Sequence, residues 1–175
     1  MSTTASLVSL EEYLNSSYEP DMDFVDGVLL RRNVGTPRHA LLQLIAGSYL
    51  RQHRKSHRIQ VFVEARLLVD AATGRHRIPD VLVLAVPYQQ SKVVKDVPLV
   101  IIEIVSPDDT FDDIFDRCSE YEKLGVRNIL VMDPEKRHAW LFEHGQLLVA
   151  PHGLNLGQAR IEFPVSEMFA ELDEQ

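Results

Sequence analysis

Two apolar runs of strand length each carry one carboxylate where a folded chain is expected to bury its core. The first run reads IPDVLVLAV and holds Asp80, and the second reads PLVIIEIV and holds Glu103. A charge among Val and Ile side chains costs several kcal/mol unless it is paired, hydrogen-bonded or bound to a metal. Two such acids on successive strands therefore predict one shared site, and a divalent cation is the simplest occupant.

The other patterns predict a mixed α/β fold in one domain over residues 1–175. Thr36 and Pro37 open a helix as N-cap and first helical residue, and Gly125 ends another in the left-handed conformation. We expect a mixed sheet flanked by helices, with parallel pairing only for the strand after the second long helix. The expected order is helix 9–14, hairpin 24–31, a helix from 36, strands 59–69, 78–86 and 98–105, helix 112–124, strand 128–132, hairpin 137–149 and helix 166–172.

Composition is that of a soluble globular protein, with 45% hydrophobic and 25% charged residues. No apolar run reaches the roughly 18 residues that span a bilayer, so we expect no membrane association. The N-terminal residues lack the basic and apolar regions of a secretory signal. The single cysteine, Cys118, fits a reducing compartment. We therefore expect a cytoplasmic protein.

Charge is divided unevenly along the chain. Residues 31–63 contain seven Lys and Arg and no acid, so the net charge of −8 leaves −15 on the remainder. A basic segment beside an acidic pocket suits a metal-dependent enzyme that acts on a polyanion. A solvated helix face followed by a basic loop explains the same charges. The segment's cations are Arg31, Arg32, Arg38, Arg51, Arg54, Lys55 and Arg58.

Antiparallel pairing of strands 78–86 and 98–105 would bring Asp80 and Glu103 to the same end of the sheet. This arrangement suits Mg2+, for which Mn2+ is the usual substitute, because Mg2+ takes few carboxylates and keeps several waters. The metal would make a hydroxide accessible and neutralise charge on a phosphoryl oxygen. Glu64, on the preceding strand, is a candidate third metal ligand.

Six segments resemble, in the same order, the putative restriction-endonuclease domain family, formerly a domain of unknown function. The segments are DFVDG, TPRHALL, IPDVLVL, PLVIIEIVSPDD, EYEKLGV and ILVMDP, and the similarity covers about residues 10–149. That family is abundant in bacteria and is similar to the PD-(D/E)XK nuclease superfamily. The resemblance implies a restriction-endonuclease-like αβββαβ core at about residues 36–133, with extra N-terminal and C-terminal hairpins. It also implies an endonuclease that hydrolyses phosphodiester bonds in DNA.

Position by position, Pro79-Asp80 resembles the PD motif and Glu103 the acid that follows it, so the resemblance implies that both bind Mg2+. Glu64 matches a helping acid more weakly. His39 resembles a histidine at the start of the first core helix, where it would touch a phosphate or lie behind the metal.

The chain departs from the superfamily pattern two residues after Glu103, where Val105 stands in place of the usual lysine. The family commonly carries this lysine on the next helix, and there the spacing reads Asp113, Arg117, Tyr121. Arginine stays protonated, so Arg117 can stabilise charge but cannot take a proton from water. We predict Arg117 as the third catalytic residue.

A second hypothesis keeps the fold without catalysis: a Glu103–Arg117 ion pair would fill the metal site of a binding or scaffold module. In this sequence Tyr121 is expected to be a core anchor, and Asp108 and Asp109 to be loop acids near a helix start. A homodimer would suit cleavage of a palindromic duplex. The residues expected to contact DNA are His39, Arg38, Arg51, Arg54, Lys55 and Arg58.

Overall fold

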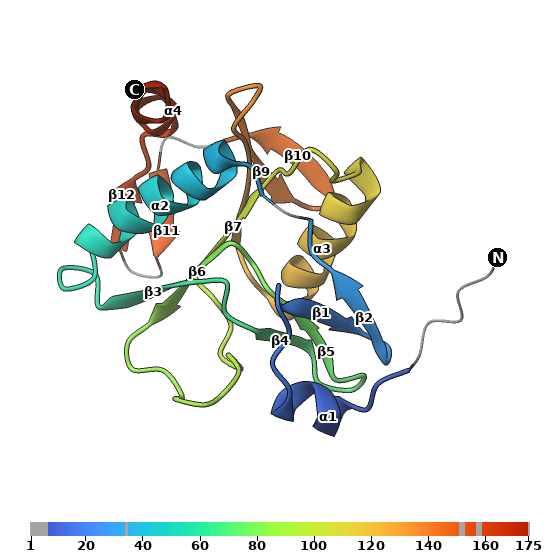
Figure 1. Cartoon of the computed structure of the whole chain (residues 1–175). Helices are drawn as coiled ribbons and strands as arrows, with labels where there is room; N and C mark the ends of the chain where they lie inside the picture. The colour runs from blue at the N-terminus through green and yellow to red at the C-terminus, as the bar shows by residue number, and fades with distance from the viewer. Residues whose placement is uncertain (1–6, 34, 151–152, 157–158, 175) are drawn as a thin grey trace.

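The computed structural model describes residues 7–33, 35–150, 153–156 and 159–174 (Figure 1). Its elements are α1 (Leu10–Asn15), β1 (Met22–Val25), β2 (Val28–Arg31), α2 (Pro37–Gln52), β3 (Ile59–Val63), β4 (Leu67–Asp70), β5 (Arg75–Arg77), β6 (Val81–Ala85), β7 (Val100–Ile104), α3 (Phe111–Leu124), β8 (Asn128–Asp133), β9 (His138–Glu143), β10 (Gln146–Val149), β11 (Gly153–Leu156), β12 (Ala159–Glu162) and α4 (Val165–Asp173).

The largest sheet in the described residues has six strands in the order β10-β9-β8-β7-β6-β3. Strands β6 and β7 pair antiparallel, whereas β7 and β8 pair parallel across the α3 crossover. From α2 to β8 this gives the expected αβββαβ order, with the β9–β10 hairpin added at one edge. The prediction of a mixed sheet flanked by helices is confirmed.

The predicted continuous strand 59–69 is wrong, because the chain breaks between β3 and β4. At the break, Glu64 has a left-handed φ of 50°, a conformation that a strand cannot accommodate. Strand β3 then belongs to the six-stranded sheet, and β4 joins a second sheet in the order β2-β1-β5-β4. Strand β5, which the sequence analysis did not predict, is an inner strand of this smaller sheet.

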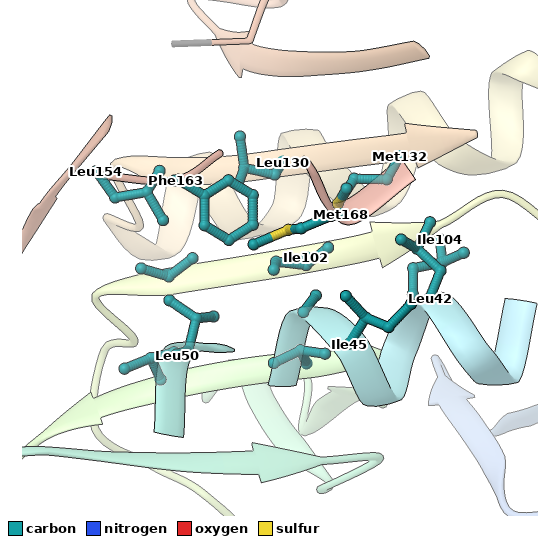
Figure 2. Packing of buried hydrophobic residues seen from close by; sticks show 14 of the residues in the cluster. Leu42, Ile45, Leu50, Ile102, Ile104, Leu130, Met132, Leu154, Phe163 and Met168 are labelled. Carbon is teal, nitrogen blue, oxygen red and sulfur yellow. The ribbon is translucent and has the colours of Figure 1, made fainter. Parts of the chain in front are cut away.

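Helices cover both faces of the large sheet, which explains why its central strands are apolar throughout. Side chains alternate along β7: Ile102 and Ile104 pack toward α2, and Ile101 packs toward α3. Figure 2 shows the α2 side of this core, where Leu42 and Ile45 face β7. The opposite face packs against α3 and buries the single cysteine, Cys118.

Local capping sets the position of α3 above the sheet. Thr110 accepts a hydrogen bond from the Asp113 amide, and the Asp113 carboxylate accepts one from the Thr110 amide, which completes a capping box. At the other end Gly125 has a φ of 105°, as predicted from the sequence. The helix so fixed carries Arg117 and Tyr121 on the side that faces β7. None of the helices in the described part of the chain is long and apolar enough to cross a membrane.

Candidate active site

Asp80 and Glu103 lie at the same end of the large sheet, as the antiparallel pairing predicts. Asp80 precedes β6, and its carboxylate Oδ2 accepts a hydrogen bond of 2.7 Å from the amide of Ile104, the residue directly after Glu103. Only 2% of Asp80 and 4% of Glu103 is exposed. Two carboxylates are therefore buried side by side where β6 and β7 meet.

The surroundings of Asp80 keep it ionised. Its Oδ1 lies 2.7 Å from Nη2 of Arg32, and its Oδ2 lies 3.4 Å from Nε2 of His39. Burial raises the pKa of Asp80, but His39, Arg32 and the Ile104 amide together outweigh burial and hold the pKa below its ordinary value. Burial lowers the pKa of His39, and its contact with Asp80 outweighs that effect and raises the pKa. His39 thus contacts the Asp80 carboxylate and lines the same cleft.

Glu103 faces the opposite helix. Its Oε1 accepts a 2.7 Å hydrogen bond from the Tyr121 hydroxyl, and its Oε2 lies 3.2 Å from Nε of Arg117. Burial raises the pKa of Glu103 to about 7, against the lowering effect of Arg117. Tyr121 is buried, as expected of a core anchor, but it also orients the carboxylate, which the sequence analysis did not foresee.

Arg117 contacts Glu103, as the second hypothesis expected, but this ion pair is poorly formed. Its Nε is buried without a hydrogen-bond partner of suitable geometry among the described residues. A buried ion pair offsets the cost of desolvation only when its geometry is good and its donors are satisfied. The contact therefore gives little support to a site whose purpose is the Glu103–Arg117 pair itself.

Asp109 has a larger role than that of the loop acid expected from the sequence. Its Oδ1 accepts hydrogen bonds from Nη2 of Arg117 at 3.2 Å and from Nδ2 of Asn33 at 3.1 Å. Its Oδ2 accepts a bond of 2.8 Å from the Ser106 amide. Asp109 thus holds the Arg117 guanidinium against Glu103 and ties the loop before α3 to the chain after β2.

Arg32 and Glu64 complete the Asp80 side of the site. Nη1 of Arg32 lies 3.5 Å from Oε1 of Glu64, so Arg32 bridges a buried acid and an exposed one. The Glu64 amide and the Gln43 side chain both donate to the Asp80 carbonyl, at 3.2 Å and 2.9 Å. The sequence analysis counted Arg32 only as part of a basic segment, because no local pattern links it to a residue 48 positions away.

A second buried ion-pair network lies beside the site and joins the small sheet to α3. Arg77 donates to Asp23 at 3.0 Å and to both carboxylate oxygens of Glu120 at 2.7 Å and 2.9 Å. Arg75 adds contacts to Glu120 and Asp26. Glu120 follows Arg117 by about one helical turn, so this network fixes the helix segment that carries Arg117.

A cleft of about 300 Å3 lies between the two sheets and α3, and its lining includes Asp80, Glu103 and Arg117. Seven acids and four arginines line it, together with His39. The excess of acids favours a cation. The acids are Asp23, Asp80, Glu103, Asp108, Asp109, Asp113 and Asp116.

The donor atoms fit a hard cation that takes two carboxylates and fills its other positions with water. Among the described residues, no three His, Cys, Asp or Glu side chains converge closely enough to hold a metal. Asp80 and Glu103 supply two carboxylates, which is a usual number for Mg2+. Glu64 reaches the site through Arg32, and its role as a direct metal ligand stays a prediction.

The predicted DNA-contacting residues separate into three groups. His39 lies in the site. Arg38 lies at the same end of α2 but pairs with Asp173 at 2.8 Å and with Glu135 at 3.8 Å. At 1.5 Å per residue, Arg51 lies about 18 Å from His39 along α2. Within the described part of the chain, none of these last four cations forms a salt bridge: Arg51, Arg54, Lys55 and Arg58.

Comparison with known proteins agrees with this architecture. The fold resembles the crystal structure of a putative nuclease belonging to DUF820 from Anabaena variabilis ATCC 29413, with a TM-score of 0.77 and 18% identity over 94% of this chain and 99% of that chain. A cryoEM structure of a DrdV–DNA complex gives a TM-score of 0.39 and 18% identity, over 77% of this chain and 11% of that chain. No curated protein matches the sequence. The family model of Uma2, described as "Putative restriction endonuclease", matches residues 10–167. Because the family model matches most of this chain, the chain belongs to the Uma2 family of putative restriction endonucleases.

Proposed function

We propose that this protein is a Mg2+-dependent endonuclease that hydrolyses phosphodiester bonds in DNA. The observation that carries the proposal is the placement of Asp80 and Glu103, which are buried together at the floor of an acid-rich cleft. Membership of a family described as restriction endonucleases supports the same reaction class.

In this proposal Asp80 and Glu103 hold Mg2+, with Mn2+ as a substitute. When bound, the metal supplies a Lewis acid and lowers the pKa of a coordinated water. His39 orients the Asp80 carboxylate through its contact with Oδ2, and Tyr121 orients Glu103 through its hydroxyl. Arg117 is held by Asp109 and keeps its proton, so it stabilises negative charge on the phosphate instead of accepting a proton.

The nucleic-acid surface of this proposal begins at the cleft and continues along α2. The four cations near the end of α2, which form no salt bridge with the described residues, suit phosphate contacts, because phosphate binding is driven by Lys and Arg. Arg38 contributes only if it leaves Asp173. Two copies related by a two-fold axis would present two sites to a palindromic duplex. Light scattering on the protein with and without duplex DNA tests that dimer.

Calorimetric titration with Mn2+ tests the metal site directly. We expect the wild type to bind Mn2+ and to nick supercoiled DNA, and Asp80→Asn to lose both properties. Asp108→Asn is a matched control, because it removes the same charge from the same cleft at an exposed residue. Equal Mn2+ affinity in wild type and Asp80→Asn would contradict the proposal.

The second candidate function is a nucleic-acid-binding or scaffold module without catalysis. It is favoured by one observation: Arg32, Ile104, Tyr121 and Arg117 already contact all four carboxylate oxygens of Asp80 and Glu103. A ligand that binds only the folded state must raise the melting temperature. No thermal stabilisation by Mg2+ or Mn2+, together with retained DNA binding, would select this second candidate.

A further inference from the structure

Arg32 contacts the side-chain oxygen of Asp80 that neither the Ile104 amide nor His39 engages. Oδ2 is engaged by the Ile104 amide at 2.7 Å and by His39 at 3.4 Å. Oδ1 contacts Arg32, at 2.7 Å. A metal that binds Oδ1 therefore competes with the Arg32 guanidinium, because two positive charges cannot share that oxygen without strong repulsion.

The two arginines of the site differ in how firmly they are held. Arg117 rises from the middle of α3 and is held between Glu103 and Asp109. Arg32 follows directly after β2, which is an edge strand of the small sheet, and its side chain is 22% exposed. Movement of Arg32 requires no change in a helix.

Glu64 offers Arg32 a second, exposed carboxylate. Its side chain is 56% exposed and already lies 3.5 Å from Arg32. Its backbone has a left-handed φ of 50° and is fixed by the bond from its amide to the Asp80 carbonyl. A non-glycine residue persists in this conformation only where the surrounding structure maintains it, which is common near functional sites. Here it directs a carboxylate toward Arg32.

We propose that Arg32 is a displaceable internal counter-cation that neutralises Asp80 until a divalent metal binds and then moves onto Glu64. The inference rests on the proposed metal site. In the metal-free protein, Arg32 spares Asp80 the cost of an unpaired buried charge. Once displaced, its planar guanidinium is free of Asp80, and two of its N–H groups can donate hydrogen bonds to two oxygens of a phosphate.

Mn2+ calorimetry on Arg32→Met tests the competition. Without the competing charge, we expect the Kd for Mn2+ to fall at least about tenfold, which is about 1.4 kcal/mol. The melting temperature without metal should fall, and the increase on adding Mn2+ should become larger. Arg75→Met is the matched control: Arg75 also bridges two acids, Asp26 and Glu120, and is 26% exposed, but it does not contact Asp80.

Glu64→Gln provides a second test at an exposed residue, where folding is not at risk. If Glu64 receives the displaced Arg32, Glu64→Gln weakens Mn2+ binding in the wild type and has no effect in the Arg32→Met background. If Glu64→Gln weakens Mn2+ binding equally in both backgrounds, Glu64 acts as a metal ligand, and the proposal that Arg32 moves onto Glu64 is wrong.

The remaining outcomes separate this inference from the proposed function. Equal Mn2+ affinity in Arg32→Met, Arg75→Met and wild type, with binding lost in Asp80→Asn, overturns the counter-cation and leaves the metal site intact. Binding by Arg32→Met alone supports the counter-cation strongly. No Mn2+ binding by either wild type or Arg32→Met overturns both.

Discussion

The Tyr121 hydroxyl donates a 2.7 Å hydrogen bond to the Glu103 carboxylate, and both side chains are buried. The bond joins α3 to the central strand β7 at the floor of the cleft. It also satisfies one oxygen of a carboxylate that burial alone would leave without water. Stability and site geometry are therefore coupled at this contact.

Tyr121→Phe is expected to lower the free energy of unfolding by about 1–3 kcal/mol, because a buried acceptor then lacks its donor. Urea denaturation measures the change. Tyr49→Phe is the control, since its hydroxyl donates to the Glu162 carbonyl at the surface and should cost less. Equal losses in the two variants would contradict a special role for the buried bond.

Glu103→Gln should change how stability depends on pH. The pKa of Glu103 is raised from 4.5 to about 7, so the native state holds the proton more tightly than the unfolded chain. The stability that this provides is complete below about pH 4.5 and is lost as the pH rises through about 7. Glutamine cannot lose a proton, so the variant should gain about 1–3 kcal/mol relative to wild type between pH 5 and pH 8. Guanidinium denaturation of the variant and the wild type at pH 5 and at pH 8 measures this gain. An equal stability difference between the two proteins at both pH values would show that Glu103 does not titrate in this range.

Asp109→Asn is expected to destabilise the protein by about 1–3 kcal/mol, because Arg117 keeps a buried charge with a weaker partner. Asp108→Asn removes the same charge one residue earlier, at an exposed position, and should cost little. Thermal denaturation at low salt compares the two. If the neighbouring variants are equally stable, Asp109 does not hold Arg117 as described.

Arg117→Lys restores the residue type that the family commonly carries on this helix. Lysine can take part in proton transfer, so we expect faster Mn2+-dependent cleavage of supercoiled DNA than in wild type. The variant should also be less stable by about 1 kcal/mol, because it loses the guanidinium contact to Asp109. Arg127→Lys, at an exposed residue, is the control. Slower cleavage in Arg117→Lys would show that the guanidinium itself is required.

Arg54→Ala with Lys55→Ala should weaken DNA binding evenly across sequences. Each lost phosphate contact lowers the slope of log K against log salt by about 0.9, so the double variant should lose about 1.8. Fluorescence anisotropy at several salt concentrations, in the Asp80→Asn background to prevent cleavage, gives the slopes. Lys92→Ala with Lys95→Ala is the control, since it removes two cations from the loop between β6 and β7. An unchanged slope would remove the end of α2 from the DNA surface.

The core of the site was readable in the sequence because strand periodicity determines it. Asp80 and Glu103 stand out as charges in apolar runs, and antiparallel pairing brings them together whatever the rest of the chain does. Arg117 was predicted from the resemblance to the nuclease family, and the structure places it against Glu103. The caps at Thr36 and Gly125 are short-range signals that the structure confirms.

The outer parts of the site depend on contacts that no local pattern encodes. Arg32 reaches Asp80 across 48 positions, and Asn33 reaches Asp109 across 76. The break at Glu64 could not be read either, because nothing in an apolar run announces a left-handed glutamate. That residue is held there by the amide bond to Asp80, which is a tertiary contact.

The small sheet determines which residues a fragment needs in order to carry the whole site. Asp23, Arg32 and Asn33 all precede residue 36, yet all three line the cleft. A fragment that begins at the first core helix would keep both buried carboxylates but lose one wall of the cleft and the counter-charge of Asp80. A fragment that keeps the whole cleft must therefore include the N-terminal hairpin, although the αβββαβ pattern begins only after it.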